Sequence, residues 1–175
     1  MTTYVALLHS IVLGPGRRVV MADLKAMAVE LGFRDVRSWV ATGNLVFEAE
    51  DAPLAAVESR LETAFHAHFG KHVDIIARTA GDWRRLAAQN PFPEGNGADV
   101  GIRVMRKPLG EDALSMLRGL AAPGIALALA EGDLWVDFGG KPSETKLLSH
   151  LTTRKLGIGT LRNANTVRAL AAMLD

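Results

Sequence analysis

The chain has 175 residues, of which 49% are hydrophobic and 22% are charged, with a formal net charge of +1. This is the composition of a folded globular protein rather than a disordered one. It contains no cysteine, which excludes disulfides, thiolate catalysis and cysteine-based zinc sites. The near-neutral charge gives the whole molecule no long-range attraction to nucleic acid or to an anionic membrane, although a local basic patch stays possible.

The first half of the chain alternates between strand and helix patterns. Apolar runs that follow polar residues or breakers indicate strands, and apolar residues at i, i+3, i+4 and i+7 indicate helices. The predicted elements are a strand at 4–8, a helix through Leu24–Leu31, strands at 36–41 and 45–48, a helix between Pro53 and Gly70, and a strand at 73–77. This order predicts the split βαβ arrangement of a ferredoxin-like domain.

A short helix and a Gly/Pro-rich joint at 93–98 separate this half from a second one with a similar order of elements. The predicted elements there are a strand at 100–105, a helix at 111–120, a hairpin of strands at 125–130 and 134–138, and helices at about 143–156 and 165–174. A helix takes the place of the last strand. The sequence therefore predicts an α+β fold of two ferredoxin-like (split βαβ) subdomains in tandem, residues 1–92 and 99–175, with C-terminal helices.

Motifs spread over most of the chain resemble the domain of unknown function 1697 family of bacterial proteins. They are Tyr4-Val-Ala-Leu-Leu, Met21-Ala-Asp-Leu, Leu31-Gly-Phe, Asp35-Val-Arg, Thr42-Gly-Asn-Leu-Val-Phe, Asn90-Pro-Phe, Thr145-Lys-Leu and Thr160-Leu-Arg-Asn-Ala-Asn-Thr-Val. The resemblance implies a tandem ferredoxin-like architecture, in agreement with the order of elements. It implies no activity.

One segment and two single positions depart from the family pattern. Residues 9–15 read His-Ser-Ile-Val-Leu-Gly-Pro where relatives have Arg-Gly-Ile-Asn-Val-Gly-Gly. Ala164 replaces a tryptophan, and Val20 replaces a proline. A function that depends on the arginine and asparagine of the family's first loop would be weakened or altered in this chain.

Topology predicts a site at one edge of the first sheet. In a split βαβ sheet the first two strands are parallel, so the loop after the first and the turn after the second lie together. The candidate ligand-binding residues are His9, Ser10, Arg17, Arg18, Thr42 and Asn44. The alternatives are a solvated surface loop and a hairpin turn in which Gly43 and Asn44 tolerate positive φ.

The segment before the last helix is a second candidate. Arg162, Asn163 and Asn165 could face a ligand or a seam between subdomains. Alternatively, Asn163 or Asn165 caps the last helix, Asn165 holds loop carbonyls, and Arg162 pairs with a carboxylate.

The sequence predicts neither a metal nor a cofactor. His66 and His68 are two residues apart on a helix and point about 200° apart, so they cannot share an ion. His72 lies beyond Gly70, where the helix is expected to end.

The leading interpretation is a non-catalytic cytoplasmic binding module for a small anionic or nucleotide-like ligand. Two alternatives remain open: a nucleic-acid-binding protein and an enzyme of unassigned reaction. Membrane association is not expected, because no apolar stretch reaches the ~18 residues of a spanning helix. The sequence sets no oligomeric state.

Overall fold

The computed structural model describes residues 1–174 and divides them into two compact units. The first comprises Met1–Arg84 and the residues from Ala169 onward, and the second comprises Arg85–Arg168. The C-terminal residues belong to the first unit, to which they are hydrogen-bonded. Arg37 Nη1, for example, donates to the carbonyl oxygen of Met173 at 2.7 Å. Among the described residues, no helix has both the length and the apolar character needed to cross a bilayer.

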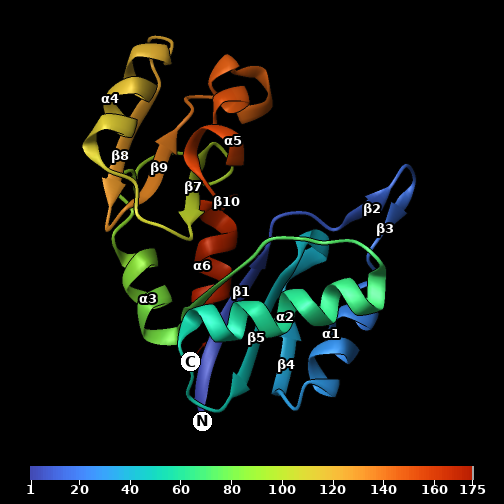
Figure 1. Cartoon of the computed structure of the whole chain (residues 1–175). Helices are drawn as coiled ribbons and strands as arrows, with labels where there is room; N and C mark the ends of the chain where they lie inside the picture. Colours follow the sequence, from blue (N-terminus) through green and yellow to red (C-terminus); the bar gives the residue numbers. More distant parts are fainter. Residues whose placement is uncertain (175) are drawn as a thin grey trace. The chain divides into compact units, whose positions relative to one another are not determined.

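The first unit contains a four-stranded sheet, two long helices and a small hairpin (Figure 1). Its elements are β1 (Thr2–Leu8), β2 (Val12–Gly14), β3 (Arg17–Arg18), α1 (Met21–Glu30), β4 (Arg34–Ser38), the 3-10 turn η1 (Val40–Thr42), β5 (Asn44–Ala49), α2 (Leu54–Phe69) and β6 (Ile75–Thr79), followed by the start of α3 (Ala80–Ala88) and ending with the last residues of α6 (Ala164–Ala172). The β2–β3 hairpin occupies a loop in which the sequence predicted no strands; Gly16, at φ +70°, makes its turn.

The sheet has the strand order β4-β5-β1-β6, and every neighbouring pair is antiparallel. The first strand of the chain therefore lies between the third and fourth strands of this sheet. Near its C-terminal end, Leu7 pairs with Asn44 and Leu8 pairs with Ile75.

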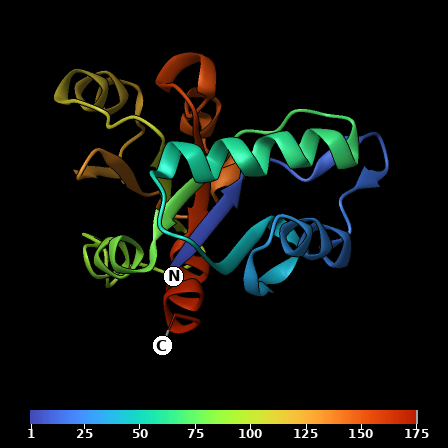
Figure 2. The same ribbon diagram turned by 60° about the horizontal axis from the view of Figure 1, so that its bottom comes forward.

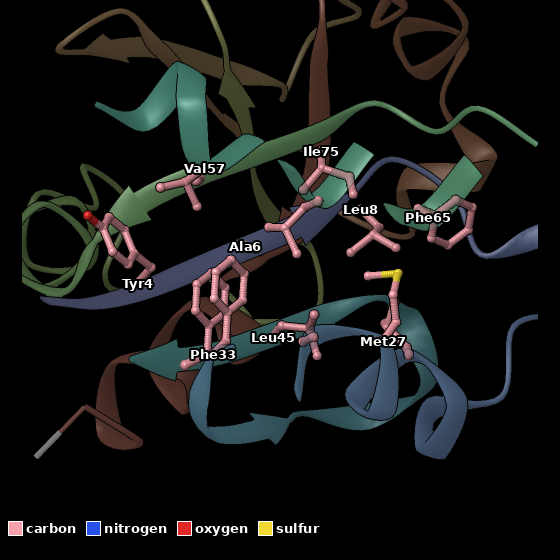
Figure 3. Close-up of a cluster of buried hydrophobic side chains, with 14 of the residues drawn as sticks. Tyr4, Ala6, Leu8, Met27, Phe33, Leu45, Val57, Phe65 and Ile75 are labelled. Carbon is pink, nitrogen blue, oxygen red and sulfur yellow. The ribbon is translucent and has the colours of Figure 1, made fainter. Parts of the chain in front are cut away.

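Helices α1 and α2 lie on one side of this sheet (Figure 2), and the side chains of the core fill the space between them and the sheet (Figure 3). Tyr4, Ala6 and Leu8 alternate along β1 and face the helices, as the period of two in a strand requires. The rings of Phe33 and Phe47 stack with centroids 4.4 Å apart. The core draws on every long element of the unit, so it fixes the register of the whole sheet.

Edge strand β6 is held to α2 by side chains as well as by the core. Glu58 and Glu62 are one turn apart on α2 and accept hydrogen bonds from the backbone N–H groups of Ala77 and Ile75, at 2.9 and 3.1 Å. These two amides point away from β1, toward the free edge of the sheet.

The second unit contains a sheet with the same positional order of strands as the first. The order is β10-β7-β9-β8, again antiparallel throughout, with the unit's first strand between its third and fourth. Its elements are β7 (Val100–Met105), α4 (Glu111–Leu120), β8 (Ala126–Ala130), β9 (Asp133–Asp137), the 3-10 turns η2 (Pro142–Glu144) and η3 (Lys146–His150), α5 (Thr153–Leu156) and β10 (Gly159–Asn163), with the end of α3 and the start of α6.

Two sequence predictions for this unit are wrong. The last strand is not replaced by a helix, because β10 pairs with β7 over Gly159–Asn163. Residues 143–156 do not form one helix, because the backbone is extended at Thr145 (ψ 140°) and leaves helical geometry at Leu151 (ψ 69°). The leucines of this stretch are spaced as in a helix, but they reach the core from η3, from Leu151 after it and from α5.

Replacing Phe47 with alanine should lower the free energy of unfolding by about 3–5 kcal/mol, because it removes a completely buried ring that stacks on Phe33. Val29→Ala, at a side chain that is 58% exposed on α1, should change it by no more than about 0.5 kcal/mol. Urea denaturation measures both. A loss for Phe47→Ala as small as that of the control would contradict this description of the core.

Candidate functional site

Three segments that are distant in the sequence meet where β1 ends. The backbone N–H of Leu8 donates to the carbonyl oxygen of Gly43, and that of His9 donates to the carbonyl oxygen of Asp74, both at 2.9 Å. The loop after β1, the turn before β5 and the segment that leads into β6 therefore share one edge of the first sheet.

Gly43 is required where the first two of these segments touch. Its φ is +83°, and a Cβ atom at this position would lie 2.9 Å from both Leu8 Cβ and Ile11 Cγ2. Real Cβ atoms do not approach carbon so closely, and left-handed backbone is costly for other residues. The glycine allows the turn to lie directly against the loop after β1.

The two polar residues beside Gly43 have different roles. Asn44 is completely buried, and its Nδ2 donates to Trp39 O at 3.1 Å and to Thr42 Oγ1 at 2.8 Å. Its side chain thus organises the turn and is not at the surface, where the sequence prediction placed it. Thr42 is exposed at the surface of the turn.

His9 and Ser10 line a surface depression of about 140 Å³. The other polar side chains around it come from the segment between α2 and β6: Lys71, His72 and Asp74. Its apolar part is formed by Val12, Leu13, Phe65 and Val73. The depression thus joins the end of β1 and the base of the β2–β3 hairpin to the start of β6.

Polar contacts hold the charged side chains of this depression. Lys71 Nζ donates to the carbonyl oxygen of Val12 at 3.0 Å and ties the segment after α2 to the hairpin. His72 Nε2 lies 2.9 Å from Asp74 Oδ1. The cationic and anionic groups of the rim are therefore held by specific partners.

Arg17 and Arg18 do not line this depression. Both are exposed on β3, in the hairpin that extends beyond the ends of α1 and α2 in Figure 1. Of the six residues predicted for this edge, His9 and Ser10 lie in the depression, Thr42 lies at the neighbouring turn, Asn44 is buried, and the arginines lie on the hairpin.

Sequence reasoning missed Lys71 and Asp74 as members of this site. The signal that could have found them is the predicted topology itself. In the split βαβ order the fourth strand is antiparallel to the first and next to it, so residues just before the fourth strand lie beside residues just after the first. The prediction combined the loop after the first strand with the turn after the second strand, and it left out the residues before the fourth strand.

Arg162 lies in the second unit on β10, at a buried position. Its Nη1 donates to Thr160 Oγ1 at 2.7 Å and to Leu161 O at 3.0 Å. Burial lowers the pKa of the guanidinium to about 10. The strand register pairs Arg162 with Ile102, so both side chains lie on the same face of the sheet.

Asn163 and Asn165 make structural contacts around the start of α6. Asn163 Oδ1 accepts from the N–H of Thr166 at 2.9 Å, which is the bond of a helix N-cap. Asn165 Oδ1 accepts from Arg168 Nη2 at 2.5 Å, and its backbone N–H donates to Gly97 O at 3.4 Å. Asn163 therefore caps α6, and Asn165 anchors the loop at Gly97.

Comparison with known families gives a match over residues 1–135 to the model described as "Protein of unknown function (DUF1697)". This is more than half of the chain. The protein belongs to the DUF1697 family. The resemblance found in the sequence motifs is thus confirmed, and the family brings no assigned activity with it.

A solved structure similar to this DUF1697 protein is that of the conserved bacterial protein SP0830 from Streptococcus pneumoniae. The two chains are 25% identical, the match covers 99% of each, and the TM-score is 0.78. The similarity extends over both units. No curated protein matches this member of the family.

Replacing Gly43 with alanine should lower the free energy of unfolding by about 2–4 kcal/mol, the sum of left-handed backbone strain and the clash with Leu8 and Ile11. Gly16→Ala, at φ +70° with open space around it, isolates the backbone term and should cost about 1–2 kcal/mol. Chemical denaturation compares the two. Equal losses would show that close packing at Gly43 is not the constraint.

Replacing Asn163 with alanine should cost about 1 kcal/mol of stability, because the N–H of Thr166 loses its acceptor. Asn163→Asp keeps an acceptor oxygen at the N-terminus of α6 and should stay close to the original protein. The measurement is the urea midpoint of each variant. If the aspartate variant lost as much as the alanine variant, the capping role would be refuted.

Proposed function

We propose that this protein is a non-catalytic binding module for a small anionic ligand, held in the depression at the end of β1. The observation that carries the proposal is the convergence of Lys71, His9, His72 and Ser10 around one hollow of about 140 Å³. The ammonium of Lys71, the imidazole of His9 and the hydroxyl of Ser10 are donors suited to phosphate or carboxylate oxygens.

The size of the depression limits what it can enclose. Pockets that bury a drug-sized ligand measure roughly 300–1,000 Å³. A hollow of about 140 Å³ therefore suits one phosphate-sized group, and the remainder of a nucleotide-like ligand would extend along the rim toward Thr42.

Lys71 is the central residue of the proposed site. An ammonium group has three N–H donors, and the bond to Val12 O uses one of them. That bond holds the long side chain over the hollow, so less conformational entropy is lost when an anion binds. Asp74 places a negative charge on the same rim next to His72, so Lys71, His9 and Ser10 are the proposed contacts to the anion.

We also propose that residues 1–92 and 99–175, which hold the first and the second sheet, are ferredoxin-like subdomains in tandem, and that the protein works in the cytoplasm. The support for the first point is the strand order, which is the same in both sheets and places the first strand between the third and fourth. The absence of cysteine is compatible with the second.

Replacing Lys71 with glutamine should weaken the binding of inorganic phosphate and of phosphate-bearing metabolites by about tenfold or more, because it removes a charge-assisted hydrogen bond. Lys107→Gln, at an exposed lysine of the second unit, changes the net charge equally and should bind as the original protein does. Isothermal titration calorimetry in low salt with a chelator present measures affinity, and thermal shift gives an independent readout. Equal affinities for the two variants, or no stabilisation of the original protein by any phosphate compound, would overturn the proposal.

A further inference from the structure

We propose that Glu62, His72 and Asp74 form a binding site for a divalent transition-metal ion, with Zn²⁺ as the best-suited ion. These three side chains offer one carboxylate oxygen each from Glu62 and Asp74 and one ring nitrogen from His72. The three ligand atoms all lie within 4.8 Å of one another. The inference concerns a cation and does not depend on the proposed anion site.

The spacing of the ligand atoms suits a single ion. Zinc binds nitrogen and oxygen ligands at about 2.0–2.2 Å, so two ligands of one ion lie roughly 3–4 Å apart. His72 Nε2 and Asp74 Oδ1 are already 2.9 Å apart. Small side-chain rotations therefore bring all three groups into one coordination sphere.

Hydrogen bonds to the backbone position the carboxylate of Glu62 and the main chain of Asp74 independently of any ion. Glu62 Oε2 accepts from the N–H of Ile75 at 3.1 Å, which places the carboxylate of an α2 residue over the start of β6. Asp74 is held through its carbonyl oxygen, which accepts from the N–H of His9. A carboxylate has about four lone-pair sites, so a carboxylate that accepts from a backbone N–H can also coordinate a metal.

His72 and Asp74 lie on the same side of the segment that leads into β6. Val73, between them, is buried, while His72 is exposed and Asp74 is half-buried. With the proton of the neutral ring on Nδ1, the Nε2 lone pair and Asp74 Oδ1 face the same point. The hydrogen bond that joins these two atoms without the ion needs the proton on Nε2 instead, so the ion takes the place of that proton.

The charge of the cluster favours a cation of this class. Two carboxylates and a neutral imidazole carry a formal charge of about −2, which a divalent ion neutralises. A mixed nitrogen and oxygen set selects zinc and its first-row neighbours, whereas Mg²⁺ prefers oxygen ligands alone. His72 also lines a second hollow with His66, Ser59 and Thr63, so the ion would have open coordination positions.

This proposal revises the sequence prediction of no metal. That prediction compared His66, His68 and His72 with one another and found no carboxylate neighbour that would complete a site. The structure instead surrounds His72 with carboxylates, one of them from α2 and ten residues earlier in the chain.

The test is a titration of the full chain with ZnCl₂ by calorimetry, together with Co²⁺ as a spectroscopic probe of nitrogen coordination. The original protein should bind one Zn²⁺, and His72→Gln, Glu62→Gln and Asp74→Asn should each weaken binding by about tenfold or more. Glutamine retains an oxygen that can accept from Ile75, so Glu62→Gln should stay folded, which its urea midpoint checks.

His68→Ala is the matched control. His68 is on α2, as Glu62 is, but its Nε2 lies 3.0 Å from Glu30 Oε2 and outside the proposed site. This variant should bind zinc as the original protein does. Lys71→Gln should also retain zinc, and Glu62→Gln should retain phosphate, so the two proposals can fail separately. No stoichiometric binding, or equal binding by the original protein and the Glu62 and Asp74 variants, would overturn the metal site.

Discussion

The antiparallel pairing of β1 between β5 and β6 is the constraint on which the rest of the first unit depends. Leu8, the last residue of β1, bonds to Gly43 on one side, and His9, which follows it, bonds to Asp74 on the other. Because the strand alternates between the two faces of the sheet, a slip of one residue would turn Tyr4, Ala6 and Leu8 away from the helices. The same slip would separate the loop at His9 from its neighbours. The register of β1 with β5 and β6 therefore determines both the packing of the core and the position of the surface site.

Much of the fold could be predicted from local patterns, and its failures have identifiable causes. The strand at Val100–Met105 and the helix at Glu111–Leu120 have the predicted bounds, because both patterns are long and periodic. β10 was missed because Thr160, Arg162 and Asn163 are polar, and only pairing with β7 makes that stretch a strand. Residues 143–156 satisfied a helical period although extended residues interrupt them. Tertiary contacts decided both stretches.

The surface site could be predicted only in part. Topology brought His9 and Ser10 to the correct edge, but Lys71 and Asp74 are more than 60 residues away along the chain and become neighbours through strand pairing. Asn44 illustrates a different difficulty. A polar residue in a turn can bind a ligand or its own backbone, and burial alone separates the two roles. The same ambiguity applied to Asn163, whose oxygen caps α6.

The paired glutamates of α2 have a consequence for the behaviour of the protein in a crowded solution. An outer strand with unused amides can template another chain and start fibre growth. On β6 the outward amides of Ile75 and Ala77 are already occupied by Glu62 and Glu58, and a second molecule would first have to displace two anionic groups. In addition to covering the core, helix α2 thus disfavours strand pairing between two molecules at β6.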